Sequence, residues 1–528
     1  MSSKGLFAIC AGFLCLGAAN AVSTTGAYNI RDFGAESGGE ALCTQAIQSA
    51  VDQCAKDGGG TVLLPPGTWL TGTVYLKSHV TIRLENGCTV LGSKEKNHYG
   101  RPRGEGETFS SWAIFAGKGL EHVAICGQGT IDGQGANFRY KEGARPKNLY
   151  FEGCRDVLIE GVRLRNAGSW MQHYRDCDRL RIRDVAVFNH VGYNNDGLNI
   201  DSCRDVTISG CVVDSDDDGI VLKSLSTKPC ENVTISDCVV SSHCNSIKMG
   251  TESGGGFQNI TVTNCAVCSP RYSQVTYGRQ RGLAGIALEI VDGGTLDRVA
   301  ISNITIKGVT APIFMRLGNR ARAFEPNQSK PSVGTLRNVV LSDIIATDCS
   351  PIGCSITGLP DHPIESVTLS NISLGFEGGG TKDDAVREIS EKPDSYPEST
   401  MFGTLPSYGF FCRHVKGLKL QNVHLQTSAS DYRHALLLSD VENAVIDSLD
   451  APFARDSAAM LRLNDCWSVS IRNCRPPEGT NVFLSLTGKG TTAVSLYGNS
   501  FEGVSTICDR GPEVAGSALI LWSNHTAQ

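Results

Sequence analysis

The chain repeats a short pattern of alternating apolar and polar residues. An apolar anchor is followed by any residue, then Ile or Leu, then any residue and a turn residue. Five consecutive anchors, at intervals of 23, 26, 27 and 27 residues, are Val157, Leu180, Val206, Val233 and Ile260. Alternation with period two indicates a strand with one buried face. Because no helical pattern separates the copies, each copy predicts one rung of a coil, and stacked rungs form a parallel β-helix.

The pattern continues along most of the remaining chain. Later copies begin at Val299, Val339, Val367, Leu418, Ala444, Val469 and, in degenerate form, Val494. We therefore predict a single all-β domain over residues 22–528. It would consist of an N-terminal cap to about 118, coils that hold the acidic motifs over about 119–425, and C-terminal coils over about 426–528. The longest insertion between rungs, roughly residues 375–408, is predicted to be a surface loop, because additional residues in a solenoid form loops on one face.

A helix is predicted ahead of the rungs, from Thr44 to Lys56. Its apolar residues share one face, and three glycines end it at residues 58–60. A helix at this position would cover the end of the coil and shield its core. Strands are expected to follow at residues 61–64, 69–76 and 80–84.

The first 21 residues have the features of a secretory leader. A lysine at position 4 precedes an apolar run over residues 6–18, and Ala19-Asn20-Ala21 provides a cleavage site. The run is too short for a membrane span. We therefore expect a secreted or periplasmic protein without a membrane anchor, whose mature chain begins near Val22.

The charge of the chain limits the classes of molecule that it is expected to bind. Its net charge is −6, and acidic and basic residues are interspersed. This balance argues against a nucleic-acid partner and gives no reason to expect binding to a membrane surface. We expect the protein to act as a monomer.

The chain has 21 cysteines, two of which lie in the leader, so an odd 19 remain. Disulfides are the first expectation for an exported protein. The positions indicate instead an interior ladder, in which Cys is a small apolar residue. Four cysteines lie three residues before an anchor and four lie five residues after one: Cys154, Cys177, Cys203 and Cys230, and Cys211, Cys238, Cys265 and Cys474. We therefore predict that most thiols are free and buried.

Acidic residues interrupt the pattern at two places about one coil apart. Asp196 precedes the strand at residues 198–201, and three consecutive acids, residues 216–218, precede the next strand on that side of the coil. His243 follows another coil later. Residues one coil apart stack about 4.8 Å from each other, so these side chains are expected to converge. Crowded carboxylates raise the pKa of at least one of them, and glycoside hydrolysis requires such a protonated acid beside ionised ones.

Two other interpretations of the acids remain open. Asp and Asn are favoured in turns because they bond to the local backbone. Three adjacent carboxylates are a costly way to make a turn, which weakens that interpretation for residues 216–218. Carboxylate oxygens also suit calcium.

The acidic segments resemble glycoside hydrolase family 28, the polygalacturonases and rhamnogalacturonases. The family motifs are N-T-D-G, then G-D-D, then G-H-G. Matching positions are Asn194, Asp196, Gly197, Asp217, Asp218, Ile220, Lys223, Ser224 and His243. Further similarity lies at residues 32–35, 170, 245–248 and 312–320, so the resemblance covers roughly residues 27–425. It implies a right-handed parallel β-helix and inverting hydrolysis of pectic polysaccharides or oligosaccharides, without a metal or other cofactor.

The resemblance assigns a role to each matched acid. Asp218 would be the general acid, Asp196 and Asp217 would activate the attacking water, and His243 would tune or orient the acid. A structural histidine facing the coil is the alternative at position 243, because Ser242 and Cys244 replace the usual glycines.

The residues that would bind substrate are less closely matched. Asn194, Tyr193, Lys223 and Trp170 are candidates, the aromatic rings by stacking on sugar faces, although core packing is an equal alternative for Trp170. The family's R-I-K motif, which binds a galacturonate carboxylate, is missing. Its nearest frame is Gly285-Ile286-Ala287-Leu288-Glu289. A replacement cation is therefore expected if a uronate is bound, and the candidates are Arg316, Arg281 and Arg320.

Two rival functions remain open. A polysaccharide lyase on the same scaffold would require calcium and a basic residue for proton abstraction. A β-helical carbohydrate-binding protein or adhesin would use the acids only as turns. The sequence does not distinguish endo from exo action.

Overall fold

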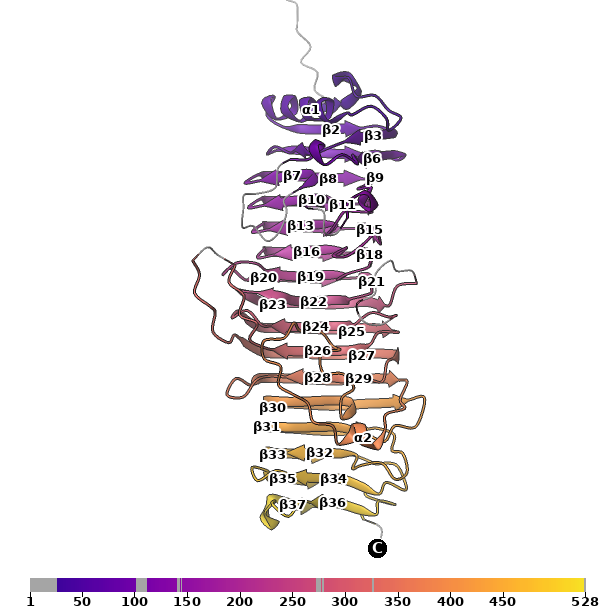
Figure 1. Ribbon diagram of the computed structural model, residues 1–528, viewed down its shortest axis with the longest axis vertical. Helices are drawn as coiled ribbons and strands as arrows, with labels where there is room; N and C mark the ends of the chain where they lie inside the picture. Colours follow the sequence, from indigo (N-terminus) through magenta and orange to yellow (C-terminus); the bar gives the residue numbers. More distant parts are fainter. Residues whose placement is uncertain are drawn as a thin grey trace, which may run out of the picture.

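The computed structural model describes residues 26–100, 112–139, 143, 145–271, 277, 280–324 and 327–526. The predicted leader, residues 1–21, lies outside the described residues. Each coil of the chain stacks on the coil before it, and all strands in named ladders pair in parallel with strands of the neighbouring coil (Figure 1). The predicted all-β parallel β-helix is therefore confirmed.

The strands form three faces around the coil. The first face consists of β4 (Val74–Tyr75), β7 (Ala113–Lys118), β10 (Lys147–Glu152), β13 (Gln172–Arg175), β16 (Leu198–Asp201), β19 (Ile220–Ser224), β22 (Asn245–Ser253), β24 (Ala284–Ile290), β26 (Ala311–Leu317), β28 (Cys354–Thr357), β32 (Leu461–Asn464), β34 (Val482–Thr487) and β36 (Thr506–Arg510). The second consists of β1 (Ala27–Asn29), β2 (Gly60–Leu64), β5 (Val80–Leu84), β8 (Glu121–Gly127), β11 (Arg155–Glu160), β14 (Asp178–Arg183), β17 (Arg204–Ser209), β20 (Cys230–Ser236), β33 (Trp467–Arg472), β35 (Thr492–Tyr497) and β37 (Leu519–Trp522). The third consists of β3 (Gly67–Thr71), β6 (Cys88–Gly92), β9 (Thr130–Asp132), β12 (Arg163–Arg165), β15 (Ala186–Asn189), β18 (Val212–Ser215) and β21 (Val239–Ser242).

Longer strands run from one face into the next in the second half of the chain. They are β23 (Gly256–Cys268), β25 (Thr295–Lys307), β27 (Thr335–Cys349), β29 (Ile364–Phe376), β30 (Ser407–Thr427) and β31 (His434–Asp450). Pairing is continuous at both predicted internal boundaries, because β7 pairs with β10 and β30 pairs with β31. The division of the domain near residues 118 and 425 therefore stays a prediction.

The helix α1 (Thr44–Lys56) has the predicted bounds and lies over the N-terminal end of the coil (Figure 1). Its buried residues are Ile47, Ala50, Val51 and Cys54. The described part of the chain also has a short helix α2 (Lys382–Ala385) and the 3-10 turns η1 (Ile30–Phe33), η2 (Lys96–His98), η3 (Gly135–Asn137) and η4 (Gly516–Ala518). Neither α1 nor α2 is long and apolar enough to cross a membrane.

One predicted strand, residues 69–76, is divided. It forms the end of β3 and, after a break, β4. The break lies at Gly72, where an added Cβ would stand 1.9 Å from the carbonyl oxygen of His98. The chain turns there from the third face to the first, and hydrophobic alternation does not reveal this turn.

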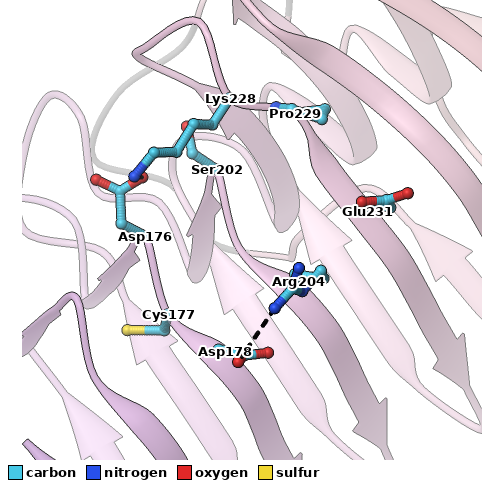
Figure 2. Close-up of a pocket in the computed structure, with 8 residues that line it drawn as sticks. All are labelled: Asp176, Cys177, Asp178, Ser202, Arg204, Lys228, Pro229 and Glu231. Atoms are coloured by element: carbon cyan, nitrogen blue, oxygen red, sulfur yellow. Dashed lines mark hydrogen bonds and ion pairs between the residues drawn. The ribbon is translucent and has the colours of Figure 1, made fainter.

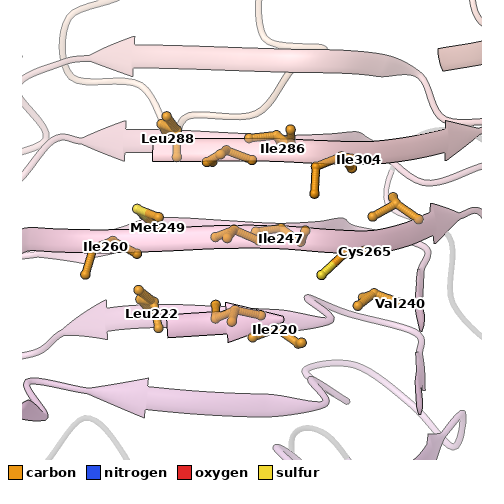
Figure 3. Close-up of a cluster of buried hydrophobic side chains, with 14 of the residues drawn as sticks. Ile220, Leu222, Val240, Ile247, Met249, Ile260, Cys265, Ile286, Leu288 and Ile304 are labelled. Carbon is orange, nitrogen blue, oxygen red and sulfur yellow. The ribbon is translucent and has the colours of Figure 1, made fainter. Parts of the chain in front are cut away.

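The core consists of stacked aliphatic residues. Ile220 and Leu222 in β19 lie in register with Ile247 and Met249 in β22, and those with residues 286 and 288 in β24 (Figure 3). All are at most 1 % exposed. Burial of this kind contributes about 25 cal/mol per Å² of apolar surface. The repeating alternation of the sequence therefore creates one continuous column of apolar contacts along the coil.

Each coil enters the second face through a left-handed residue. The residue before the strand anchor has φ between 53° and 59° at Asp156, Arg179, Asp205, Asn232, Asn259, Arg298, Asn338, Ser366, Asn443, Ser468 and Ala493. Asn and Asp, the commonest residues in this set, tolerate this conformation better than most others. The turn residues thus repeat at the same place in successive coils.

The cysteines form the predicted interior ladder. None of the 19 from Cys43 to Cys508, all within the described residues, is in a disulfide, and only Cys126, Cys268 and Cys508 are partly exposed. The thiols of Cys177 and Cys203 donate to the carbonyl oxygens of Arg175 and Asp201, at 3.4 and 3.3 Å. Burial and backbone hydrogen bonds, rather than covalent bonds, therefore account for these residues.

We expect titration of the protein in denaturant without reductant to count most of these 19 cysteines as free thiols. The physical reason is that each ladder thiol occupies a packed site that protects it from oxidant. The same titration after reduction is the control for total cysteine. A count near one thiol before reduction would show that a disulfide framework holds the coil together.

Candidate active site

The predicted acids converge on the first face of the coil. Asp196 precedes β16, Asp217 and Asp218 precede β19, and Asn245 begins β22. The turns stack through main-chain hydrogen bonds: Gly197 N donates to Asp218 O, and Gly219 N donates to Asn245 O, each at 2.9 Å. Three adjacent rungs therefore place their turn side chains on one flank, as the spacing of about one coil predicts.

Glycine follows the acid in both turns because the rungs approach closely there. A Cβ at Gly197 would stand 2.3 Å from a methyl group of Val213 and 2.6 Å from Gly219 O. A Cβ at Gly219 would stand 2.4 Å from Val240 and 2.6 Å from Ser246 O. In each Asp-Gly pair, the glycine thus allows the rungs to pack closely, and the aspartate supplies the carboxyl group of the site.

The groups around Asp218 stabilise its ionised form. Lys248 Nζ lies 3.3 Å from its carboxylate. The main-chain N and side-chain Nδ2 of Asn245 both donate to Asp218 Oδ1, at 3.3 and 3.0 Å. Burial opposes the charge, but Lys248 and Lys223, together with the Asn245 amide, hold the pKa of Asp218 below its usual range. Asp218 is therefore a buried, ionised carboxylate.

Asp217 has a different environment. Its Oδ1 accepts from the main-chain N of Asp218 at 2.9 Å, and its Oδ2 accepts from the hydroxyl of Tyr277 at 2.6 Å. Burial and the neighbouring charge of Asp218 raise the pKa of Asp217, against the effect of Tyr277. Among the described residues no Lys or Arg lies within ion-pair distance of Asp217. Its protonated form is therefore favoured relative to that of Asp218.

Asp196 lies against Lys223, whose Nζ is 3.6 Å from Asp196 Oδ2 and 3.2 Å from Glu252 Oε2. Burial and the charge of Asp217 raise the pKa of Asp196 well above its usual value. Burial opposes the charge of Lys223, but Glu252 and Asp196 raise its pKa overall. The prediction placed Lys223 at the site, and the structure puts it between these two acids.

Further charged residues of the site were missed by the sequence analysis. Lys248 lies 3.8 Å from Glu289 and 3.9 Å from Glu398, in addition to its contact with Asp218. Glu289 takes the last position of the frame in which R-I-K was sought. Glu398 comes from the insertion between β29 and β30, and no regular spacing connects it to the rungs. Only Lys248 had a signal, in the segment 245–248 that resembles the family.

His243 does not make the contacts that its predicted role requires. No hydrogen bond joins it to Asp217 or Asp218 within the described structure. Burial lowers its pKa, and the charges acting on it are those of Asp216, His190 and Asp214. The role of orienting the general acid is therefore not supported by any contact of His243.

His190, which the sequence analysis did not identify, bridges two acids on the same flank. Its Nδ1 lies 2.7 Å from Asp216 and its Nε2 lies 2.9 Å from Asp214. Burial opposes protonation, but both carboxylates favour it, and the pKa of His190 rises to about 9. The sequence feature that pointed to this pair was Asp216, which replaces the glycine of the family motif. Its carboxylate pairs with the imidazolium of His190.

Asn194 connects the first acidic turn to Asp217. Its main-chain N donates to the hydroxyl of Tyr277, at 3.1 Å, and the same hydroxyl donates to Asp217. Its side-chain oxygen accepts from Arg145 at 2.9 Å. The ring of Tyr193 packs edge-on against that of Tyr277 and is 50 % exposed. Stacking of Tyr193 on a sugar stays a prediction.

Trp170 does not offer an open face for a sugar. It is 6 % exposed, and the ammonium groups of Lys223 and Lys147 lie 4.7 and 5.4 Å from its ring centroid. Such cation–π contacts stabilise a buried ammonium. The structure therefore favours packing under the site over the stacking role predicted for Trp170.

The three arginines proposed as replacements for R-I-K are engaged elsewhere, Arg320 with Asp292. Arg316 is 1 % exposed and donates to Thr357 Oγ1 and to the carbonyls of Gly358, Glu391 and Lys392, so it anchors the long insertion to the coil. Its substrate-binding role is not supported, because substrate would have to displace these bonds. Arg281 donates to Asp348 O and to Glu377 Oε1. Its binding role stays a prediction that would require breaking this pair.

A metal ion is a poor fit to the acids. Asp217, Asp218 and Cys244 each offer a ligand atom within 4.8 Å of the others. Calcium prefers six to eight oxygen ligands, and this group supplies two carboxylates and a thiol. Lys248 also already compensates the charge of Asp218. The donor set therefore favours chemistry by the carboxyl groups themselves.

A separate surface pocket of about 330 Å³ lies where the first face turns into the second (Figure 2). Four of its five charged residues form two pairs: Arg204 lies 3.3 Å from Asp178, and Lys228 lies 3.4 Å from Asp176. The side chains of these four residues therefore already have partners within the pocket.

Comparisons with known proteins identify the family of the chain. Residues 54–394 match the model of glycosyl hydrolases family 28. A Vitis vinifera protein named "Probable polygalacturonase" is 33 % identical over 213 residues, which are 37 % of this chain and 43 % of that protein.

Two solved structures share the fold. An exopolygalacturonase from Thermotoga maritima has a TM-score of 0.58 at 22 % identity, over 76 % of this chain and 91 % of that one. A polygalacturonase from Erwinia carotovora has a TM-score of 0.53 at 18 % identity, over 66 % and 93 % of the two chains. At these identities the likeness concerns the fold. Because the family model matches more than half of the sequence, the chain belongs to family 28 of the glycosyl hydrolases.

Proposed function

We propose that this protein hydrolyses glycosidic bonds in pectic polysaccharides or oligosaccharides by inverting acid and base catalysis. The observation that carries the proposal is the stacking of three buried aspartates on adjacent rungs, each with different partners: Lys223 at Asp196, Tyr277 at Asp217 and Lys248 at Asp218. The pKa is raised at Asp196 and Asp217 and lowered at Asp218. A protonated carboxyl beside an ionised one is the requirement for this chemistry. The names of the family relatives supply the class of substrate.

The contacts favour a different division of roles from the one that the resemblance suggested. Asp218 was expected to be the general acid, but Lys248 and Asn245 stabilise its ionised form. We infer that Asp217 donates the proton to the leaving oxygen. Asp218, the carboxylate with the lowered pKa, activates the water, and Asp196 on the preceding rung, whose pKa is raised, helps to hold that water. The ammonium group of Lys223 supplies a positive charge beside Asp196.

Inversion gives the proposal a direct test. We expect proton NMR of the first-formed product to show the anomer opposite to that of the substrate bond, because water attacks from the face opposite the leaving group. Oxygens of Asp217 and Asp218 lie within 4.8 Å of each other. The family resemblance supports inversion, and retention is the alternative, because retaining enzymes hold their two carboxyls only roughly 5–5.5 Å apart. A retained anomer would therefore assign the reaction to this close pair and refute the proposed water activation.

The reaction type is tested with a product profile on polygalacturonate, rhamnogalacturonan and their oligomers, with and without chelator. Saturated products formed equally well in chelator support hydrolysis. Unsaturated products that absorb in the ultraviolet and disappear with chelator would indicate a lyase. Binding of glycan without any product would indicate a carbohydrate-binding protein or adhesin.

We also propose that the enzyme is exported after removal of residues 1–21 and acts as a monomer. The apolar run and the cleavage site of the sequence support export. N-terminal sequencing of the protein recovered outside the cytoplasm, followed by size-exclusion chromatography with light scattering, tests both statements. A mature protein that begins at Met1, or a stable dimer, would contradict them.

A further inference from the structure

A second group of side chains lies beside Asp218, on the side of the insertion between β29 and β30. Glu398 and Tyr396 come from the insertion, and Lys248 comes from β22. Lys248 Nζ lies 5.8 Å from the ring centroid of Tyr396, which is 52 % exposed. Nδ2 of Asn245 donates both to Asp218 Oδ1, at 3.0 Å, and to Glu398 Oε2, at 3.3 Å. The insertion thus brings a carboxyl and an open aromatic ring to the edge of the catalytic acids.

The insertion is held in this position by specific contacts. Ser399 Oγ donates to Leu283 O at 2.6 Å. Met401 packs against the apolar cluster of Ala284, Ala287 and Phe314 on the outer side of the first face. Glu398 lies between the aromatic ring and this anchor in sequence, so its carboxyl is fixed relative to the catalytic rungs.

At pH 8, above the pKa of about 7 of Glu398 and at the pKa of about 8 of Glu289, this group carries more negative than positive charge. One ammonium, that of Lys248, faces the three carboxyls of Asp218, Glu289 and Glu398 at 3.3, 3.8 and 3.9 Å. The guanidinium of Arg320 lies 5.7 Å from the ring centroid of Tyr396, and both oxygens of Asp292 pair with it. A sugar carboxylate placed here would meet more negative than positive charge, and a buried carboxylate without a cation is unfavourable.

We propose that Glu398, Lys248 and Tyr396 form the subsite for the sugar on the insertion side of the cleaved bond, and that this subsite takes an uncharged sugar and discriminates against a uronate. The inference rests on the proposed function and names the substrate class of the same site. Tyr396 supplies a ring face for the sugar. Glu398 supplies the repulsive element that specificity commonly requires.

The protonation of Glu398 makes the discrimination depend on pH. Burial raises the pKa of Glu398 to about 7, against the effect of Lys248. Below that value the carboxyl is neutral and donates a hydrogen bond, and above it the carboxylate repels a uronate. Rejection of uronates should therefore strengthen as the pH rises from 6 to 8. The titratable groups near Glu398 are Lys248, Asp218, Asp217, Glu289, Cys244 and Tyr396.

The test compares three substrates of matched length: an oligogalacturonide, its carboxyl-reduced form, and an alternating oligomer with rhamnose. We expect kcat/KM at pH 8 to be about tenfold or more higher for a substrate with an uncharged sugar at this subsite, since one repulsive charge contact typically contributes a factor of this size. Lowering the pH to 5 should reduce the ratio of kcat/KM for the substrate with the uncharged sugar to kcat/KM for the oligogalacturonide. Glu398→Gln should reduce the ratio at pH 8 about tenfold, mainly through KM. Glu391→Gln, in the same insertion but paired with Arg413 and His414, is the matched control.

The pH series on the unmodified enzyme tests the inference even if Glu398→Gln fails to fold. Preference for the fully charged oligogalacturonide at every pH would overturn the subsite while leaving the proposed function intact. An unchanged ratio in folded Glu398→Gln would also overturn it. Absence of hydrolysis of all three substrates, and of longer pectic polymers, would refute the proposed function together with the subsite.

Discussion

Replacing Asp217 or Asp218 with asparagine is expected to lower kcat on the natural substrate about 10²–10⁴-fold, the usual contribution of a general acid or base. The two variants should differ on a nitrophenyl glycoside of the sugar that the product profile identifies. A nitrophenolate leaves without protonation, so Asp217→Asn should regain much of its activity on it. Asp218→Asn should not, because its water is still not activated. The measurement is kcat for both substrates with both variants.

The exposed turn residue Asp237 offers a matched control. Asp237→Asn makes the same chemical change at a left-handed position that Asn tolerates, so activity on both substrates should be unchanged. Recovery by Asp218→Asn instead of Asp217→Asn would restore the roles that the family resemblance first suggested. Near wild-type turnover by both folded variants would remove the acidic turn from the mechanism.

Replacing Lys248 with methionine is expected to impair both rate and stability. The substitution leaves Asp218, Glu289 and Glu398 buried without their common cation, and loss of one partner of a buried pair costs about 3–5 kcal/mol. The pKa of Asp218, now held below its usual range, should rise, so the acid limb of the pH–rate profile moves to higher pH. At neutral pH kcat/KM should fall about 100-fold or more.

The stability deficit of Lys248→Met should itself depend on pH. Without the lysine these carboxyls have pKa values above those of the unfolded chain. Stability is therefore retained at low pH, where they are protonated, and is lost as the pH rises through their folded pKa values. Urea unfolding at pH 4.5 and 7.5 measures this. Adding Glu289→Gln should recover part of the stability but not the rate.

The surface residue Lys416, 3.3 Å from Glu442, is the control. Because that pair is exposed, Lys416→Met should change the free energy of unfolding by less than about 1 kcal/mol. An unmoved acid limb in Lys248→Met would show that Asp218 does not depend on Lys248 for its ionisation.

The repeated part of the molecule was predictable because one period governs both the sequence and the stacking. Val157, Leu180, Val206 and Val233 lie in register in the structure, as their spacing predicts. Alignment of the turns at Asp196 and Asp218 followed from the same period. Helix α1 was predictable from its apolar face and its terminal glycines.

The rest of the site depends on contacts that do not repeat. Glu398 reaches the rungs from an insertion, and its partner Asn245 lies 153 residues away. Arg316 was predicted to bind substrate because the sequence does not show which groups surround an arginine. In the structure it donates to four carbonyl and hydroxyl oxygens. The division between Asp217 and Asp218 also had no sequence signal, since adjacent aspartates differ only in which cations their side chains meet.

The recurring left-handed turn makes each coil without a long insertion an interchangeable unit. A coil that carries its own turn residue and contacts only the coils before and after it can be duplicated or lost whole, without changing the hydrogen-bond register elsewhere. The catalytic aspartates occupy only the neighbouring rungs of β16 and β19, with Lys248 on the next. The chain thus has the means to lengthen or shorten at either end during its evolution while the reaction centre is inherited unchanged.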